Sequence, residues 1–127
     1  MVYIGCGIKI TARATDGCLD AIPRELLRYQ TAAENVPFSE WMDSIERRHL
    51  DVYATVLNRL DRVEDGNFGG CKDLDDGVWE LKIDIGPGYR VYYGKDGDLV
   101  VLLLGGTKKT QKRDIKTAKS YWTEYNA

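Results

Sequence analysis

The chain has 127 residues, of which 43% are apolar and 30% are charged, and its formal net charge is −2. This length suits one domain with a single modest core, and the composition is that of a folded protein, which excludes a disordered chain. The small net charge excludes no class of partner, because the charges are unevenly distributed: residues 107–127 contain six basic and two acidic residues. A basic end of this kind can orient an anionic ligand.

The cysteines and the single histidine do not form a metal-binding pattern. Cys6, Cys18 and Cys71 are an odd number without CxxC spacing, and His49 is isolated at an apparent junction between two helices. We therefore expect no metal site, reduced thiols and a structural or surface role for His49. No run of about 18 apolar residues and no signal-peptide pattern is present, so we expect a cytoplasmic protein with no membrane partner.

The N-terminal stretch is the least patterned part of the chain. Residues 1–20 have no sustained period, although YIGCGIKI, residues 3–10, fits a short strand. The segment RELLRYQTA follows Pro23 and leads to the polar connector AENVP. We interpret the first 20 residues as an appendage to the domain.

Two helices are predicted after this connector. The first begins near Pro37 and carries apolar residues at helical spacing, namely Phe38, Trp41, Met42 and Ile45. After RRH, the second carries the apolar positions Leu50, Tyr53, Ala54, Leu57 and Leu60. The turn signal EDGNFGG ends it, so the two helices form a hairpin.

Two strands follow, VWELKIDI (78–85) and YRVYY (89–93), which alternate polar and apolar residues. With the residues Gly-Pro-Gly (86–88) as a three-residue loop, Asp84 faces Arg90 and Lys82 faces Tyr92 across the hairpin. This register matches polar to polar and apolar to apolar residues, whereas a two-residue loop pairs the faces wrongly.

The C-terminal part of the chain is predicted as a strand and a helix. Asp96-Gly97 is a strong turn, and the strand LVVLLL (99–104) is apolar on both sides, as in a central strand covered on both faces. A helix over 109–124 follows, with two stripes: Ile115, Ala118, Trp122 and Tyr125 are apolar, and Lys108, Lys112, Lys116 and Lys119 are basic. The expected fold is α+β, with a small antiparallel sheet, an N-terminal helical hairpin and a C-terminal helix.

The polar side chains of the hairpin share one face, namely Lys82, Asp84, Arg90 and Tyr92. One interpretation is a solvated face with a cross-strand Asp84–Arg90 pair. The other is a site for a phosphate and a stacked base, because the apolar central strand and Lys108-Lys109 adjoin this face. GGTKKT resembles a phosphate-cradling loop before a helix, although a need for positive φ at Gly105 or Gly106 is the simpler explanation.

The motifs GVWELKIDIGPGYRVYY and LLLGGTKKTQKRDIKTAKSYW, with VPFSEWMDSIERR and GNFGGCKDL, resemble the HigB-like addiction-module killer proteins of the RelE/ParE toxin superfamily. The resemblance covers about residues 23–125. It divides the chain into an N-terminal extension, 1–21, and a RelE/HigB-like toxin domain, 22–127.

The resemblance implies a toxin of a type II toxin–antitoxin module with a compact α+β fold. Its activity is implied to be that of a metal-independent endoribonuclease, or mRNA interferase, without cofactors, which cuts mRNA on the ribosome and inhibits translation. The ribose 2′-OH attacks the adjacent phosphate in such a reaction. The implied partner is a helix-turn-helix antitoxin encoded in the same operon, through which alone the protein reaches operator DNA.

The resemblance also implies roles for single residues. Arg90 matches the arginine of the GYR motif and clamps the phosphate, Lys82 matches a strand lysine, and Lys108 or Lys109 matches the cation after the final strand. Glu80 and Asp114 are alternatives for the general base, since the histidine of several relatives is absent. The residues expected to contact RNA are Tyr92, Gln111, Lys112, Lys116 and Lys119.

Two other functions remain open at the level of the sequence. One is a poison of DNA gyrase, as in the ParE branch of the same superfamily. The lysines and Arg90 on the sheet face make this function less favoured than RNA cleavage. The other is a non-catalytic protein that only binds an antitoxin and acts as a co-repressor.

Overall fold

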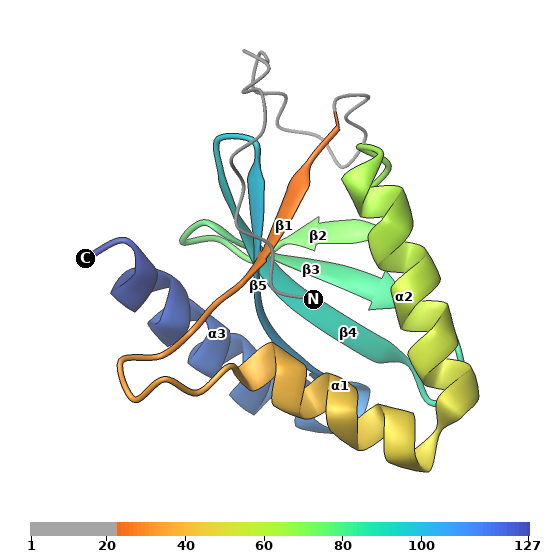
Figure 1. Cartoon of the computed structure of the whole chain (residues 1–127). Coiled ribbons are helices and arrows are strands. Elements are labelled where there is room, and N and C mark those ends of the chain that lie inside the picture. Colours follow the sequence, from red (N-terminus) through yellow and green to blue (C-terminus); the bar gives the residue numbers. More distant parts are fainter. Residues whose placement is uncertain (1–22) are drawn as a thin grey trace.

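The protein is represented by a computed structural model that describes residues 23–127 (Figure 1). A five-stranded sheet carries helices on both faces. The elements in chain order are β1 (Glu25–Arg28), α1 (Pro37–Arg48), α2 (Leu50–Glu64), β2 (Cys71–Asp73), β3 (Val78–Ile83), β4 (Tyr89–Asp96), β5 (Leu99–Thr107), a 3-10 turn η1 (Lys108–Thr110) and α3 (Gln111–Tyr125).

The strand order in the sheet is β1-β5-β4-β3-β2. Strands β2 to β5 pair in an antiparallel manner, and β1 pairs with β5 in a parallel manner. The expected α+β class, with a helical hairpin and a C-terminal helix, is thereby confirmed and is consistent with a RelE-like fold. The parallel edge strand was not foreseen, because the four residues ELLR lack a clear alternation. The possible strand at 3–10 lies outside the described residues.

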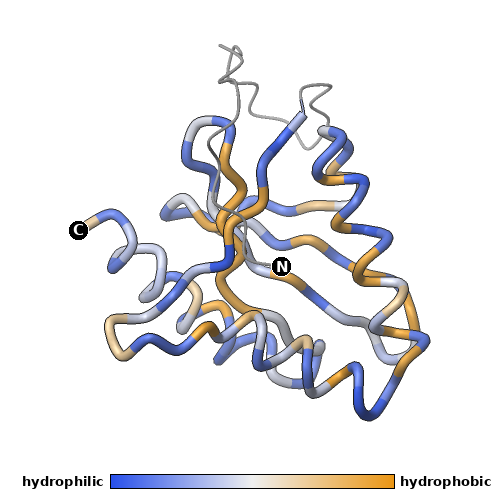
Figure 2. The backbone as a smooth tube through the Cα atoms, viewed as in Figure 1, coloured by the Kyte–Doolittle hydropathy of each residue, from blue (hydrophilic) through white to orange (hydrophobic). Residues whose placement is uncertain are grey.

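Two apolar cores lie on opposite faces of the sheet. Helices α1 and α2 cover one face, where Phe38, Val56 and Leu102 belong to the same buried cluster. Helix α3 covers the other face, where Ala118 packs in a cluster with Val101 and Leu103. Figure 2 shows apolar stretches along the central strands and at intervals along the helices. The prediction of a central strand covered on both sides is confirmed for β5, whose residues 100–103 are buried.

Helix α1 follows its predicted pattern. Pro37 stands at the first helical position, where its missing N–H costs nothing, and Arg47 and Arg48 lie in the last turn, where they complement the helix dipole. Phe38, Met42 and Ile45 are buried, and Trp41 packs half-buried against the same core.

The predicted apolar stripe of α2 is confirmed at Leu60, which is buried, and at Tyr53, which packs partly buried against the same core. It is wrong at Leu50, Ala54 and Leu57, which are exposed. The buried residues are Val52, Val56, Leu60 and Val63. Leu50 is 66% exposed and Leu57 is 37% exposed. Helix α2 carries two apolar stripes at helical spacing, and the stripe of β-branched valines faces the sheet. Periodicity identifies each stripe but does not choose between them.

The predicted register of the β3–β4 hairpin is wrong by two residues. Lys82 faces Arg90, and Glu80 faces Tyr92, so that the loop contains the five residues 84–88. A turn within this loop is closed by the Gly88 N–H, which donates to the Ile85 carbonyl at 3.0 Å. Gly86 and Gly88 have φ values of 55° and 94°, which favour glycine. A shift by two residues keeps each side chain on its predicted face, which is why alternation alone did not exclude the longer loop.

The next turn is displaced by one residue from its predicted position. Asp96 pairs with Leu99, so Gly97-Asp98 and not Asp96-Gly97 form the two-residue loop. Gly97 has a φ of 59°, as a loop of this length requires. An irregularity between Tyr92 and Tyr93 then shifts the β4–β5 register. Val101, Leu103 and Tyr92 nevertheless share one cluster, as predicted.

Helix α3 confirms the predicted C-terminal helix and its apolar stripe. Ala118 is fully buried, and Ile115, Trp122 and Tyr125 pack against the same core. Cys71 is disulfide-bonded, so the expectation of a reduced thiol is wrong for this residue. Within residues 23–127, no helix has the length and apolar character needed to cross a membrane.

Candidate functional site

A small basic pocket lies at the loop between β3 and β4, and we call it the Gly-Pro-Gly pocket. Its volume is about 330 Å³. It is lined by Lys82, Asp84, Ile85, Gly86, Pro87, Gly88, Arg90 and Lys108. Three cations and one carboxylate thus surround a cavity whose floor is a tight loop.

Three neighbouring strands position the cations of this pocket. Lys82 near the end of β3 pairs across the hairpin with Arg90 at the start of β4. Lys108 directly follows β5, and its N–H donates to the Gly88 carbonyl at 3.3 Å. Because the strand order is β3-β4-β5, Arg90 lies between Lys82 on one side and Lys108 on the other.

The guanidinium of Arg90 is buried and held by a carboxylate. Arg90 is 6% exposed and Glu80 is 5% exposed, and Arg90 Nε lies 3.6 Å from Glu80 Oε2. Gln111 Nε2, at the start of α3, donates to the same Glu80 oxygen at 2.7 Å. Arg90 Nε and Nη1 are buried and have no hydrogen-bond partner among the described residues. A guanidinium fixed in this way places its positive charge beside the pocket without needing to be ordered first.

Lys82 and Asp84 form the exposed rim of the pocket. Lys82 Nζ lies 3.6 Å from Asp84 Oδ1, and their side chains are 53% and 82% exposed. The predicted Asp84–Arg90 pair is therefore wrong. Asp84 is the one carboxylate that lines the Gly-Pro-Gly pocket. Had the five-residue loop 84–88 been assumed from the sequence, Asp84 would have been placed in this loop, at the rim of the pocket.

Tyr92 does not offer its ring to a ligand. It is fully buried beneath α3, so the predicted stacking of an RNA base on this residue is wrong. Its hydroxyl has no hydrogen-bond partner among the described residues. Burial raises the pKa of Tyr92 most, and the charges of Glu80 and Asp114 raise it further. The hydroxyl therefore stays protonated behind Arg90.

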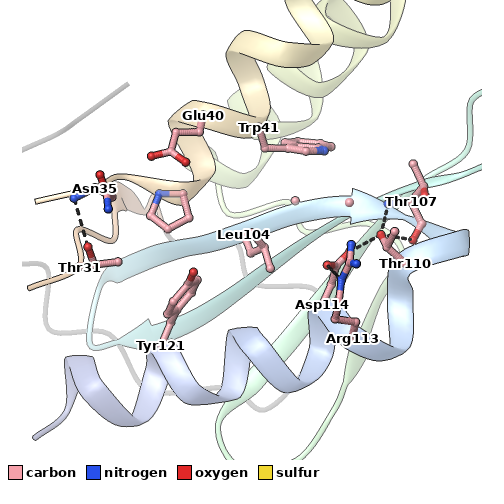
Figure 3. A pocket seen from close by; sticks show the side chains of 13 residues that line it. Thr31, Asn35, Glu40, Trp41, Leu104, Thr107, Thr110, Arg113, Asp114 and Tyr121 are labelled. Carbon is pink, nitrogen blue, oxygen red and sulfur yellow. Dashed lines mark hydrogen bonds and ion pairs between the residues drawn. The ribbon is translucent and has the colours of Figure 1, made fainter. Parts of the chain in front are cut away.

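A second, larger cavity lies between α1 and α3, and we call it the α1–α3 pocket (Figure 3). Its volume is about 580 Å³. It is lined by Thr31, Asn35, Pro37, Glu40, Trp41, Leu104, Gly105, Gly106, Thr107, Thr110, Arg113, Asp114 and Tyr121. Asp114 is 7% exposed and accepts a hydrogen bond from the Thr110 hydroxyl. This candidate base thus lines a different cavity from Arg90.

The two adjacent glycines of β5 let side chains approach the strand from both faces. A Cβ on Gly105 would lie 2.2 Å from the Trp41 ring, and one on Gly106 would lie 2.0 Å from Asp114 Oδ2. Neither glycine has a positive φ, and both lie within β5. The expected need for positive φ is therefore wrong. The segment 105–110 forms the end of β5 and the turn η1, and phosphate binding by it stays a prediction.

The structure brings together Lys82, Arg90 and Lys108 of the expected site residues, with Glu80 behind Arg90. The other expected site residues do not line the Gly-Pro-Gly pocket; they are the catalytic candidates Lys109 and Asp114 and the expected RNA contacts Tyr92, Gln111, Lys112, Lys116 and Lys119. The side chains of Lys109, Lys112 and Lys116 are exposed. The basic stripe of α3 is interrupted, since Lys119 Nζ lies 3.2 Å from Asp76 Oδ2.

Metal ligands do not cluster in the described part of the chain. No three His, Cys, Asp or Glu side chains among these residues are placed to hold a metal ion together. His49 is exposed at the junction of α1 and α2, as predicted.

The chain matches a known protein family over most of the described residues. A family model described as "Phage derived protein Gp49-like (DUF891)" matches residues 40–122. This range includes every residue of the Gly-Pro-Gly pocket. A protein of Haemophilus influenzae described as uncharacterized is 46% identical over 83 residues, which are 65% of this chain and 82% of that protein. The chain therefore belongs to the family of phage-derived Gp49-like proteins.

Proposed function

We propose that this protein is the toxin of a type II toxin–antitoxin module and that it cleaves mRNA as a ribonuclease. The Gp49-like family is associated with toxins of such modules, and the α+β fold is consistent with a RelE-like protein. The observation that carries the proposal is the buried Arg90, fixed by Glu80 between two lysines in a pocket of about 330 Å³. Fixed cations of this kind suit the developing charge of a phosphoryl transition state.

The order of the strands suggests how the groups divide the reaction. Attack by the ribose 2′-OH forms the O2′–phosphorus bond and breaks the bond from phosphorus to O5′, with both oxygens in line. A base and an acid must then stand on opposite sides of the phosphate. We propose that Asp84, beside β3, is the base that removes the proton of the 2′-OH. Arg90 binds the phosphate, and Lys108, after β5, protonates O5′.

Glu80 is a positioning residue in this proposal. Its carboxylate is 5% exposed, lies 3.6 Å from Arg90 Nε and accepts a hydrogen bond from Gln111. A carboxylate in these contacts orients the guanidinium and is not available to a ribose hydroxyl.

The test is a cleavage assay with purified protein and mRNA, with and without ribosomes. Wild-type protein is expected to leave 5′-OH ends, and Arg90→Ala to reduce the cleavage rate by about 100-fold or more. Arg47→Ala, which removes an exposed arginine on α1, is the matched control and should cleave normally. Circular dichroism checks the folding of each variant. Growth arrest with intact mRNA would overturn the proposal, and DNA breaks linked to gyrase would replace it with a gyrase poison.

A second candidate is a non-catalytic protein that binds an antitoxin. The observation in its favour is that no histidine lines the Gly-Pro-Gly pocket and that Glu80 is already engaged by Arg90. Under this alternative, expression of the protein alone neither arrests growth nor cuts mRNA, whereas a small DNA-binding protein encoded beside it co-purifies with it.

A further inference from the structure

The α1–α3 pocket has no part in the proposed cleavage chemistry, yet it adjoins the Gly-Pro-Gly pocket. We propose that it binds a guanine base of the RNA, next to the phosphate held at Arg90. This inference rests on the proposed ribonuclease function and adds a base preference to it. The α1–α3 pocket has a volume of about 580 Å³, which is within the range of cavities that hold small molecules.

Aromatic side chains approach the cavity from two helices. Trp41 of α1 and Tyr121 of α3 both line it, and both are partly buried (Figure 3). The Tyr121 ring is also supported from behind by Tyr29, at 5.1 Å between ring centroids. Unpaired bases of single-stranded RNA bind by stacking on such rings, at about 1–3 kcal/mol per base in general.

Hydrogen-bond acceptors at this site match the donor edge of guanine. Guanine presents N1–H and N2–H₂ side by side, and one carboxylate can accept both. Asp114 Oδ2 accepts a hydrogen bond from Thr110, and Asp114 Oδ1 lies 4.0 Å from Arg113 Nε. A carboxylate has about four lone-pair positions, so acceptor capacity remains beside these two contacts. Glu40 supplies a second carboxylate, and Arg113 supplies a donor for guanine O6.

The two pockets share a wall at the end of β5. Thr107 lines the α1–α3 pocket, and the next residue, Lys108, lines the Gly-Pro-Gly pocket. Gly106 pairs directly with Arg90 across the β4–β5 ladder, where paired Cα atoms are about 5 Å apart. Neighbouring parts of one RNA strand can therefore occupy both pockets.

The charges around the entrance favour a nucleotide over a cationic protein side chain. The side chain of Arg113 is 78% exposed, so a positive charge stands at the rim. Lys109 and Lys112, close to Asp114 in sequence, are also exposed. The exposed cations Arg113, Lys109 and Lys112 outnumber the exposed carboxylate Glu40, so this part of the surface repels an incoming arginine or lysine and attracts a phosphate.

The experiment is a titration of the full chain with guanosine 5′-monophosphate, in which isothermal calorimetry measures the binding. Inosine 5′-monophosphate is the matched ligand, since it lacks only the 2-amino group, and adenosine 5′-monophosphate tests a different edge. We expect the guanosine nucleotide to bind at least about tenfold more tightly than either. The other two bases lack the 2-amino donor, so they leave acceptor positions of the carboxylates without a partner.

Two variants test the carboxylates, and one serves as a control. Asp114→Asn should remove the preference for guanosine over inosine. Because Asp114 is buried and that variant can fail to fold, Glu40→Gln, at an exposed position, is measured as well and should weaken binding several-fold. Glu46→Gln, an exposed carboxylate of α1 outside both pockets, should bind as wild type does.

The outcomes separate this inference from the proposed function. Equal binding of the three nucleotides, or no binding while Arg90-dependent cleavage persists, overturns the guanine pocket and leaves the ribonuclease standing. Guanosine-selective binding without any cleavage supports the pocket and overturns the ribonuclease. Competition by arginine amide but by no nucleotide would assign the pocket to a protein partner and would also overturn the inference.

Discussion

At the scale of single residues, the sequence correctly associated Lys82, Arg90 and Lys108. Alternation placed Lys82 and Arg90 on one face, and the position of Lys108 after the last strand placed it at the same edge. The partner of Arg90 was missed, because a two-residue shift in register exchanges Asp84 for Glu80 as the nearby carboxylate. Side-chain spacing along a strand has no information on such a shift.

The buried Arg90–Glu80 pair makes a prediction about stability. Glu80→Gln should lower the free energy of unfolding by about 3 kcal/mol, because it leaves the guanidinium charge of Arg90 buried without a carboxylate. Urea denaturation measures this change. Asp84→Asn removes a carboxylate that is 82% exposed and should change stability by less than about 0.5 kcal/mol. Equal effects of the two substitutions would contradict the assigned partner.

At the scale of elements, close packing against glycines explains how α3 is docked. A Cβ on Gly94 in β4 would lie 2.4 Å from the ring of Trp122, and one on Gly77, before β3, would also lie 2.4 Å from it. Periodicity predicted that Trp122 faces the core. It did not identify the glycines as the space that this ring occupies, since they are distant in sequence and lie within or beside strands.

Gly94→Ala should therefore loosen the packing of α3. We expect a loss of about 1–3 kcal/mol of unfolding free energy, the usual cost of overpacking a core. Thermal unfolding measures the loss, and Trp122→Leu in the same chain should recover part of it. Gly70→Ala is the matched control, because no atom lies within 4 Å of its added Cβ. A loss as large in Gly70→Ala would point to the backbone rather than to Trp122.

At the scale of the whole molecule, residues distant in sequence meet at the C-terminal end of α3. The Tyr29 hydroxyl donates to Glu124, and the Tyr125 hydroxyl donates to Asp96 at 2.8 Å. Burial first, and then the neighbouring carboxylate, raises the pKa of each tyrosine from 10.0 to about 12. These contacts join the segment after β1 and the β4–β5 turn to α3. The sequence did not foresee this arrangement, since it did not predict β1.

The raised pKa values predict a loss of stability at alkaline pH. In the unfolded chain these tyrosines lose their protons near pH 10, whereas in the folded chain they retain them to about pH 12. Their contribution is therefore complete below pH 10 and is lost as the pH rises from 10 to 12. Urea denaturation measured from pH 10 to pH 12 should show that the free energy of unfolding falls less steeply with pH for the double variant Tyr29→Phe and Tyr125→Phe than for wild type. Tyr53→Phe serves as the control, and its free energy of unfolding should fall with pH as that of wild type does.

The charge balance of the Gly-Pro-Gly pocket has a consequence for the proposed ribonuclease function, because it determines which kind of phosphate the pocket can neutralise. Lys82, Arg90 and Lys108 contribute three positive charges, and Glu80 and Asp84 cancel two of them. One uncompensated positive charge equals the single negative charge of an internal phosphodiester. A terminal phosphate monoester, with nearly two negative charges, exceeds it. Under the proposed function, the pocket therefore favours phosphates in the interior of an RNA chain over its phosphorylated ends, because of charge neutralisation and not because of shape.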